Sequence, residues 1–353
     1  MKLLLVNFEM DDDSAVLAWQ AAVARKLASR CESVVVLTQR VGKFEGSDNL
    51  QIERIPQRPM GVPFRLGGGW LVNAQVVRLW RRHRIQACFI HMASEWGYRL
   101  APALRVLGVP TLLWYAHGTV TARLRLAHAL VDRVVTSTPQ GFRLRSRKVE
   151  AIGEGVDTDL FRLVNTDEDA NYLLYVGRVS RRKKVESLLD VVASVRELQP
   201  SPSLRLRIVG PTLTADDLAY DRELRARAWD LDLQDRVEFV GYVPHRQLPR
   251  FYNDAFLHIS LSETGSMDKT VLEALACGCP VLAKGEAYSE LLADHPEFLV
   301  KREDPEGLAR RVLDLYRIRH EIPRDNLRRI VEGRHDLNTY VGKVLQILGG
   351  LIR

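Results

Sequence analysis

The sequence predicts an α/β protein built from two doubly wound parallel-sheet domains. Short apolar runs alternate with helical patterns along all 353 residues, an order typical of a parallel sheet covered by helices on both faces. The chain is also long enough for two domains with separate cores. A polar, turn-rich stretch at residues 157–170 separates two halves that repeat the same pattern.

The first half carries the expected elements of one such domain. Its predicted strands are Leu3–Val6, Val34–Thr38, Ala87–His91, Thr111–Tyr115 and Val134–Ser137. Its predicted helices are Ala15–Ala28, Leu71–Arg82 and Ala122–Leu130. The Pro- and Gly-rich segment Pro56–Gly69 is interpreted as a surface loop.

The second half repeats the alternation. Its predicted strands are Leu173–Val176, Leu206–Val209, Val237–Val240, Leu257–Ile259, Pro280–Leu282 and Phe298–Val300. Its predicted helices are Val185–Glu197, Asp217–Leu231, Pro249–Asn253, Lys269–Cys277 and Pro305–Ile318. We therefore expect domains at 1–163 and 164–335. A last helix within 336–353, with Asp336 and Asn338 as candidate caps, is expected to return to the first domain.

Composition indicates a globular protein of a reducing compartment. No apolar run approaches the ~20 residues that span a bilayer, and the first residues predict a strand rather than a signal peptide, so we expect a cytoplasmic location. The four cysteines are too scattered for a disulfide framework. Cys277 and Cys279 lack a second ligand pair at a suitable spacing and are expected to be buried thiols without a metal.

The net charge of +7 is concentrated in the first half. Residues 1–160 hold 22 Lys and Arg against 14 Asp and Glu, and the remainder holds 29 against 30. Such a surface favours a nucleic acid, an anionic lipid surface or a phosphorylated acceptor as partner. Residues Leu71–Arg84 form either a membrane-surface helix with a basic edge or a core-packed helix; Phe142–Lys148 would extend the basic surface.

Residues Ser262–Ala283 have the character of a binding loop. A small polar segment leads into a helix that carries Glu273, followed by a Gly-x-Pro break and an apolar strand. Loop amides at a helix N-terminus favour anionic or hydroxyl-rich ligands, and ligands of parallel sheets bind beyond the carboxyl ends of strands. The segment resembles the nucleotide-sugar loop of the family 4 retaining glycosyltransferases.

Further segments carry the same resemblance in the same order. They are Glu154–Phe161, Val176-Gly177-Arg178 with Lys183, Val237–Val243 and Gly285–Glu290. The resemblance implies the GT-B architecture, with two Rossmann-like domains facing a central cleft. It also implies transfer from a nucleoside diphosphate sugar with retention, without a metal or other cofactor. Tyr242 would then lie beside the nucleotide base.

Arg178 and Lys183 are the expected diphosphate ligands, and Gly177 precedes them. A guanidinium just past a strand end can fork onto phosphate oxygens, and a lysine adds a compact charge, which would offset charge on the leaving diphosphate. The alternative is a solvated basic turn. Lys184 stands where the family usually has glycine, which affects the backbone of this turn.

Glu273 matches the family's second motif glutamate, which the resemblance assigns to the ribose hydroxyls; the alternative is an exposed helix carboxylate. The first motif glutamate would fall at Gly265, so the chain departs from the pattern there. Either Glu263 replaces it, or the loop contacts the donor sugar itself. The loop residues are Thr264, Gly265, Ser266, Met267, Asp268 and Lys269.

In the first domain, His117 resembles the histidine that the family keeps close to the donor sugar; the alternative is a structural histidine, and His91 is a weaker second candidate. Asp12, Asp13 and Ser14 replace the usual glycine pair after the first strand. Either Asp13 or Ser14 caps the following helix, or the loop binds acceptor hydroxyls or acts as a base toward them. A metal site is disfavoured because the aspartates are sequential.

The resulting hypothesis is a retaining hexosyltransferase that acts on a glycan or lipid-linked acceptor in polysaccharide or glycolipid synthesis, either in the cytoplasm or on the inner face of the membrane. The alternatives are a nucleotide-sugar epimerase or phosphorylase, a degenerate transferase that only binds, and a noncatalytic nucleic-acid or ligand-binding protein. No nucleic-acid recognition motif is present. The sequence does not define the base, sugar, acceptor or oligomeric state.

Overall fold

The computed structural model describes residues 1–56, 64–164, 171–199, 204–262 and 267–352. The chain forms two compact units. The first comprises Met1–Gly155 and Leu337–Arg353, and the second comprises Val156–Asp336. The chain therefore passes into the second domain at residue 156, ahead of the expected position 164, and its last helix belongs to the first domain.

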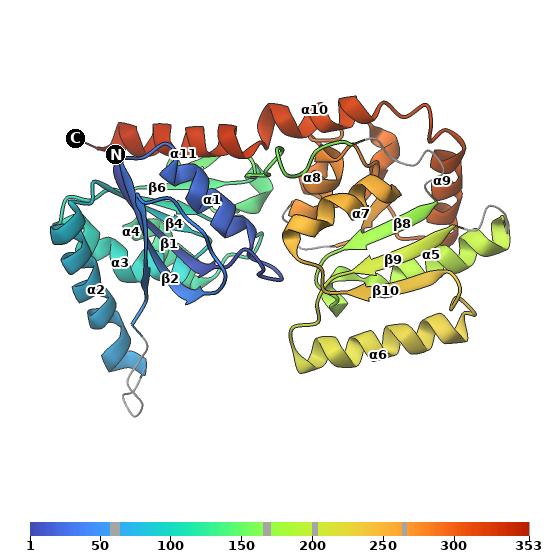
Figure 1. The fold of residues 1–353 in the computed structure, drawn as a ribbon, viewed down its shortest axis with the longest axis horizontal. Coiled ribbons are helices and arrows are strands. Elements are labelled where there is room, and N and C mark those ends of the chain that lie inside the picture. The colour runs from blue at the N-terminus through green and yellow to red at the C-terminus, as the bar shows by residue number, and fades with distance from the viewer. Residues whose placement is uncertain (57–63, 165–170, 200–203, 263–266, 353) are drawn as a thin grey trace. The chain divides into compact units, whose positions relative to one another are not determined.

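The first domain contains a seven-stranded sheet of order β3-β2-β1-β4-β5-β6-β7. Figure 1 labels β1, β2, β4 and β6 of this sheet. Every pairing in this sheet is parallel. The strands are β1 (Lys2–Met10), β2 (Ser33–Val41), β3 (Leu50–Arg54), β4 (Ala87–His91), β5 (Thr111–Trp114), β6 (Arg133–Thr136) and β7 (Val149–Ala151). The order reverses between β1 and β4, which is the topological switch point at which such sheets bind ligands.

Helices cover both faces of this sheet. They are α1 (Trp19–Ala28), α2 (Phe64–His83), α3 (Ser94–Val106), α4 (Ala122–Leu130) and α11 (Leu337–Leu351). Alternate residues of β1 reach opposite faces. Leu3 and Leu5 pack in the cluster with α1 and α11, whereas Leu4 and Val6 pack in the cluster with α2, α3 and α4. The domain core therefore includes the C-terminal helix.

Three sequence expectations in this domain are corrected. The first helix begins at Trp19 rather than Ala15, with Ala18 at its N-cap, so Asp13 and Ser14 do not cap it. Part of the expected loop Pro56–Gly69 is helical, because α2 begins at Phe64. Asn338 lies inside α11 and is not a cap.

The second domain contains a six-stranded sheet of order β10-β9-β8-β11-β12-β13. It is parallel throughout. The strands are β8 (Tyr172–Val176), β9 (Arg205–Val209), β10 (Val237–Gly241), β11 (Ala255–Ser260), β12 (Val281–Lys284) and β13 (Leu299–Val300). The switch point lies between β8 and β11, so the loops that follow these strands form the expected ligand edge.

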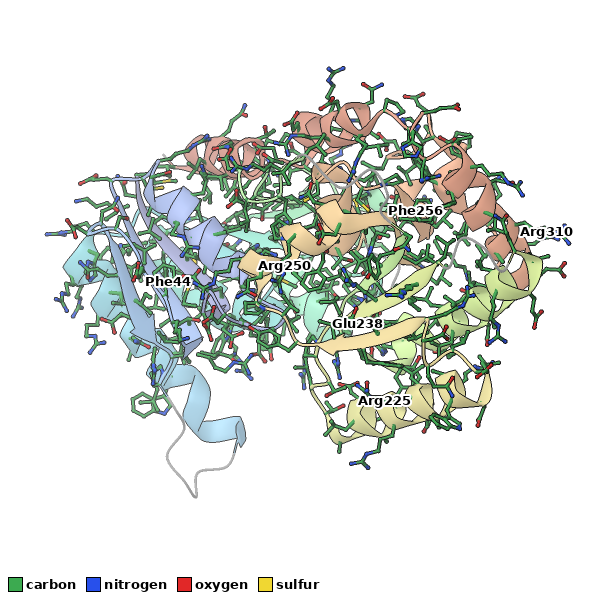
Figure 2. All side chains as sticks on the ribbon, turned by 45° about the vertical axis from the view of Figure 1, so that its right-hand side comes forward. Phe44, Arg225, Glu238, Arg250, Phe256 and Arg310 are labelled. Atoms are coloured by element: carbon green, nitrogen blue, oxygen red, sulfur yellow. The ribbon has the colours of Figure 1, made fainter. Side chains whose placement is uncertain are left out.

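The helices of the second domain are α5 (Val185–Leu198), α6 (Ala215–Asp230), α7 (Leu248–Asp254), α8 (Lys269–Ala276), α9 (Pro305–Arg317) and α10 (Arg324–Arg334). α6 runs beside β10 (Figures 1 and 2), where the Arg225 guanidinium lies 4.4 Å from the centre of the Phe239 ring. The short 3₁₀ turns η2 (Arg181–Lys183) and η3 (His245–Gln247) follow β8 and β10 and bring side chains to the carboxyl edge of the sheet.

Candidate functional site

Three neighbouring strands of the second domain, β8, β9 and β10, end at glycines. Gly177, Gly210 and Gly241 all have positive φ angles, of 152°, 150° and 78°, in a region that favours glycine. A Cβ on Gly210 would lie 1.8 Å from the carbonyl oxygen of Gly177. The loops after β8 and β9 can approach each other this closely only because Gly210 has no side chain.

Arg178 follows Gly177 and is held by a carboxylate of its own domain. Its Nε and one terminal nitrogen each lie 2.8 Å from an oxygen of Asp217 on α6. Burial would raise the pKa of this carboxyl, but two backbone N–H groups and the Arg178 guanidinium bring it below its ordinary value. These contacts fix the guanidinium and use only part of its five-donor capacity.

Lys183, the second expected phosphate ligand, is also paired. Its Nζ donates to both carboxylate oxygens of Asp268 at 2.8 Å and lies 3.4 Å from the Ser262 hydroxyl. Asp268 in turn accepts from the Ser260 hydroxyl at 3.1 Å, and its N–H donates to the Tyr288 hydroxyl. A ligand phosphate at Lys183 must therefore share or replace the Asp268 carboxylate.

Lys184 adopts a backbone conformation that favours glycine. Its φ and ψ angles are 51° and 44°, in the left-handed region. Its Nζ donates to both oxygens of Glu303 at 3.0 and 2.9 Å, and Lys284 donates to the same carboxylate. A lysine thus occupies a left-handed position in this turn, and its side chain is paired with Glu303.

Glu273 lies on α8 and is buried, so the reading of an exposed helix carboxylate is wrong. One oxygen lies 2.8 Å from His245 Nε2, and the other accepts the Tyr252 hydroxyl at 3.1 Å. Burial would raise the pKa of Glu273, but the charge and hydrogen bond of His245, with Lys269 and Tyr252, lower it below its ordinary value. The side chain is an oriented carboxylate acceptor.

The rest of the donor loop is described in part. Glu263, Thr264, Gly265 and Ser266 lie outside the described residues. Met267 is buried, and Lys269 begins α8. Tyr242 is exposed just past β10, so its ring is accessible for stacking with a planar ligand.

His117 lies past the end of β5 in the first domain. Its Nδ1 accepts the Thr119 N–H at 3.2 Å, and the Tyr115 hydroxyl donates to the Thr119 carbonyl at 2.9 Å. An accepting Nδ1 places the proton of the neutral ring on Nε2. His117 therefore presents Nε2 as a hydrogen-bond donor. His91, by contrast, is buried among aromatic rings. The centroids of its ring and the Trp19 ring are 4.7 Å apart.

The acidic loop after β1 is tied to cations of the same domain. Asp12 accepts from both terminal nitrogens of Arg25 at 3.0 and 2.7 Å, and Asp13 pairs with Lys43 at 3.0 Å. The Ser14 hydroxyl donates to Glu9. These contacts stabilise the loop within its own domain. They do not test whether the loop binds an acceptor.

The residues suggested for a membrane surface pack mostly inside the first domain. Val72, Val76 and Leu79 of α2 are buried in its core, whereas Trp70 is exposed. Lys148 Nζ donates to backbone carbonyls at the end of α4, and the carbonyl oxygen of Val131 lies 3.0 Å from it. The core-packed alternative thus accounts for the apolar face. Within the described part of the chain, no helix is long and apolar enough to cross a membrane.

The thiols are buried, as expected, and all four are free. Burial is the main cause that raises the pKa of the Cys279 thiol to about 12 and that of Cys277 further. No cluster of His, Cys, Asp and Glu suited to a metal ion occurs among the described residues.

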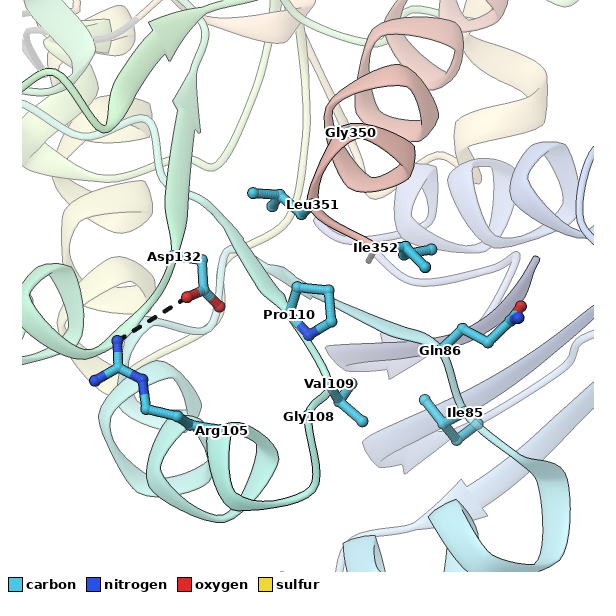
Figure 3. A pocket seen from close by; sticks show the side chains of 10 residues that line it. All are labelled: Ile85, Gln86, Arg105, Gly108, Val109, Pro110, Asp132, Gly350, Leu351 and Ile352. Atoms are coloured by element: carbon cyan, nitrogen blue, oxygen red, sulfur yellow. Dashed lines mark ion pairs between the residues drawn. The ribbon is translucent and has the colours of Figure 1, made fainter.

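A cavity of about 680 Å³ lies in the first domain (Figure 3). Gln86, Pro110 and Asp132 line it, and they directly precede β4, β5 and β6. Arg105 pairs with Asp132 at its rim, 4.0 Å apart. The cavity is therefore at the amino edge of the sheet, opposite the carboxyl edge where parallel sheets bind ligands.

Sequence reasoning missed the partners that orient the site. Asp217, His245 and Tyr252 are 39, 28 and 21 residues from the side chains that they hold. The sequence Thr214-x-x-Asp217 matches a helix capping signature. That signature does not reveal that Asp217 also binds Arg178. His245 follows a strand end, the only local sign of its position.

Comparison with known proteins gives a family match over the second domain. A family model described as glycosyl transferases group 1 matches residues 157–332. Mannosylfructose-phosphate synthase of Agrobacterium fabrum is 24% identical over 77% of this chain and 71% of its own length. D-inositol 3-phosphate glycosyltransferase of Streptosporangium roseum is 29% identical over 60% of this chain and 50% of its own length.

Solved structures match the whole chain. Sucrose-phosphate synthase of Thermosynechococcus elongatus superposes with a TM-score of 0.79 at 19% identity, covering 99% of this chain and 98% of that one. HepE of Anabaena, solved with UDP and glucose, gives 0.77 at 18% identity and 99% coverage of both. These likenesses confirm the predicted GT-B fold class of two Rossmann-like domains.

Proposed function

The chain belongs to the glycosyl transferases of group 1, of the family 4 type, and we propose that it transfers a hexose from a nucleoside diphosphate sugar with retention of anomeric configuration. The observation that carries the proposal is the carboxyl edge of the second domain. There Arg178 and Lys183 lie in the segment after β8, and Glu273 lies on α8, the helix that follows β11; β8 and β11 are the two strands of the switch point. One edge thus holds two cations suited to a diphosphate and one carboxylate suited to a diol.

The diphosphate role rests on the guanidinium of Arg178 and the ammonium of Lys183. Asp217 holds Arg178 through two nitrogens, which reduces the entropy that a free arginine side chain would lose on binding. Phosphate oxygens are the bidentate acceptors that a guanidinium prefers. Charge that develops on the leaving diphosphate would be offset by these two side chains, so the proposed reaction needs no metal.

The sugar-binding role is assigned to the 264–269 loop and His117. In the retaining mechanism that family membership implies, the departing phosphate takes the acceptor proton on the same face of the sugar. His117 would donate from Nε2 to a sugar hydroxyl or phosphate oxygen, an orientation set by its bond to the Thr119 N–H. Asp12, Asp13 and Ser14 are proposed to contact the acceptor.

Structural neighbours suggest the donor, and a sequence relative suggests the acceptor. HepE of Anabaena has been solved with UDP and with UDP-glucose, which favours a uridine nucleotide as the first ligand to test. Alpha-monoglucosyldiacylglycerol synthase of Streptococcus pneumoniae is 32% identical over 35% of this chain and 26% of its own length. A lipid-linked or glycan acceptor is therefore proposed, reached in the cytoplasm or at the inner membrane face.

Thermal unfolding of the purified protein tests the proposal. UDP, ADP, GDP and their glucose conjugates are added with and without EDTA, since a ligand that binds the folded state raises Tm. We expect one nucleoside diphosphate to raise Tm equally with EDTA, and Arg178→Ala to abolish the shift. Arg310→Ala is the matched control, because Arg310 is an exposed arginine of α9 and should leave the shift intact.

Turnover assays separate the proposed transfer from other GT-B activities. Nucleoside diphosphate released only when a sugar acceptor is present supports transfer, whereas an altered nucleotide sugar without an acceptor indicates an epimerase. Proton NMR of the product gives the anomeric configuration. No Tm shift with any nucleotide, together with a shift on adding nucleic acid, would overturn the proposal.

A further inference from the structure

His245, Glu273 and Tyr252 form a polar cluster inside the second domain. The side chain of Glu273 is 4% exposed, and that of His245 is 19% exposed. The three residues come from η3, α8 and α7. The His245 ring also lies against the ring of Phe161, with centroids 5.0 Å apart at 61°. The cluster is therefore held from several elements.

Each carboxylate oxygen of Glu273 has a donor among the described residues of the domain. Oε1 has His245 Nε2 at 2.8 Å and Oε2 has the Tyr252 hydroxyl at 3.1 Å. A carboxylate has about four lone-pair sites in all, so each oxygen retains acceptor capacity. The two hydroxyls of a ribose can be accepted together only if the carboxylate plane is fixed.

We propose that His245 is a positioning residue that fixes the Glu273 carboxylate for ribose hydroxyls, and thereby sets a preference for ribonucleotides over 2′-deoxyribonucleotides. The inference deepens the proposed function and rests on it. A buried carboxylate that lost this donor would turn toward another one, because an unsatisfied buried acceptor is costly. Its alignment with a diol would then be lost.

The position of His245 supports this role. It follows β10 and lies three residues after Tyr242, in the loop expected beside the nucleotide base. The loop that would contact the base thus also supplies the donor that orients Glu273. Neither a role in packing alone nor one in helix capping requires Nε2 to point at a carboxylate.

Two variants separate a positioning role from a packing role. His245→Gln keeps an amide donor at nearly the place of Nε2 but removes the ring. His245→Phe keeps the ring against Phe161 but removes the donor. Far-UV circular dichroism and Tm verify folding, and Tyr252→Phe, which removes the donor to the other oxygen, provides a second route to the same carboxylate.

Calorimetric titration supplies the readout. Dissociation constants are measured for UDP, ADP and GDP, for their 2′-deoxy forms, and for pyrophosphate. We expect the wild type to prefer the ribonucleotide by about tenfold or more, as for a hydrogen bond to a charged group. His245→Gln should retain that ratio, and His245→Phe and Tyr252→Phe should reduce it to about threefold or less. Pyrophosphate affinity should stay unchanged in all variants.

The contrary outcomes are distinct. A ratio kept by His245→Phe, whatever the result for His245→Gln, overturns the inference in favour of packing. A wild type that binds nucleoside diphosphates without preference overturns it while the proposed function stands. A wild type that binds none of them overturns both.

Discussion

In the second domain, the α-carbon of Gly210 faces the carbonyl of Gly177 so closely that a Cβ would lie 1.8 Å from the oxygen and 2.7 Å from the carbon. The two glycines follow β9 and β8, which are neighbours in the sheet, and β8 borders the switch point. Because backbone atoms form both sides of this contact, no side chain can rotate away to make room. The close approach of the two loops therefore depends on glycine at position 210.

We expect Gly210→Ala to destabilise the second domain by about 3 kcal/mol or more, through overpacking against backbone and through its φ of 150°. Gly333→Ala is the control. A Cβ there meets nothing within 4 Å, and Gly333 lies in α10, where alanine is favoured by about 1 kcal/mol. Urea unfolding followed by circular dichroism measures both. Equal stability of the two variants would contradict the steric argument.

Lys184 allows a test of backbone strain that is separate from its ion pair. Lys184→Ala and Lys184→Gly lose the same contact with Glu303, but only glycine adopts the left-handed conformation without penalty. We expect the glycine variant to be more stable than the alanine variant by about 1 kcal/mol, the reverse of the order inside a helix. Urea midpoints of the two variants give the difference, and a more stable alanine variant would show that the turn relaxes.

Much of the fold was predictable because buried parallel strands are continuous apolar runs. The two strands that were missed, β3 and β7, are the edge strands of their sheet. β3 reads Leu50-Gln51-Ile52-Glu53-Arg54, and its exposed side needs no apolar residues. Helix α3 was missed because Pro102 lies inside it, and proline normally predicts a helix end. Edge position and tertiary packing thus override the local pattern.

The site was predictable only where its residues belong to local motifs. Arg178 and Lys183 follow a strand end, and Glu273 belongs to a continuous segment that resembles a known family. Their partners are chosen by the fold: Asp217 contacts Arg178 across 39 residues, and Asp268 contacts Lys183 across 85. A single sequence does not reveal such pairs, because the carboxylates carry equally good local explanations as caps or loop residues.

Burial of the cysteines predicts slow thiol chemistry in the folded protein. All four are buried, and Cys31, at 9%, is the most exposed of them. Because the thiolate is the reactive form, raised pKa values slow alkylation further. We expect iodoacetamide to modify no cysteine rapidly at neutral pH, and Cys31 first during long exposure, as followed by peptide mass spectrometry. In 6 M urea all four should react; rapid native labelling of Cys277 or Cys279 would contradict their burial.

His258 on β11 should make the stability of the second domain fall in mild acid. Burial lowers its pKa to about 4, although the Asp268 charge and a backbone hydrogen bond act in the opposite direction. The unfolded chain binds this proton near pH 6.5, so between about pH 6.5 and 4 the unfolded state holds more protons and stability falls as pH falls. The change expected from this side chain is at most about 3 kcal/mol across the window.

The test compares His258→Leu with the wild type by urea unfolding at pH 7, 6, 5 and 4. The leucine variant loses the titrating ring, so its stability should decline less between pH 6.5 and 4. Asp217 titrates with a lowered pKa, and its contribution is lost only at still lower pH, so it does not mask this window. If the free energy of unfolding of both proteins declined in parallel, His258 would take up its proton in the folded state. The carboxylates of Asp268 and Glu273 would then outweigh the cost of burying the charge of the ring.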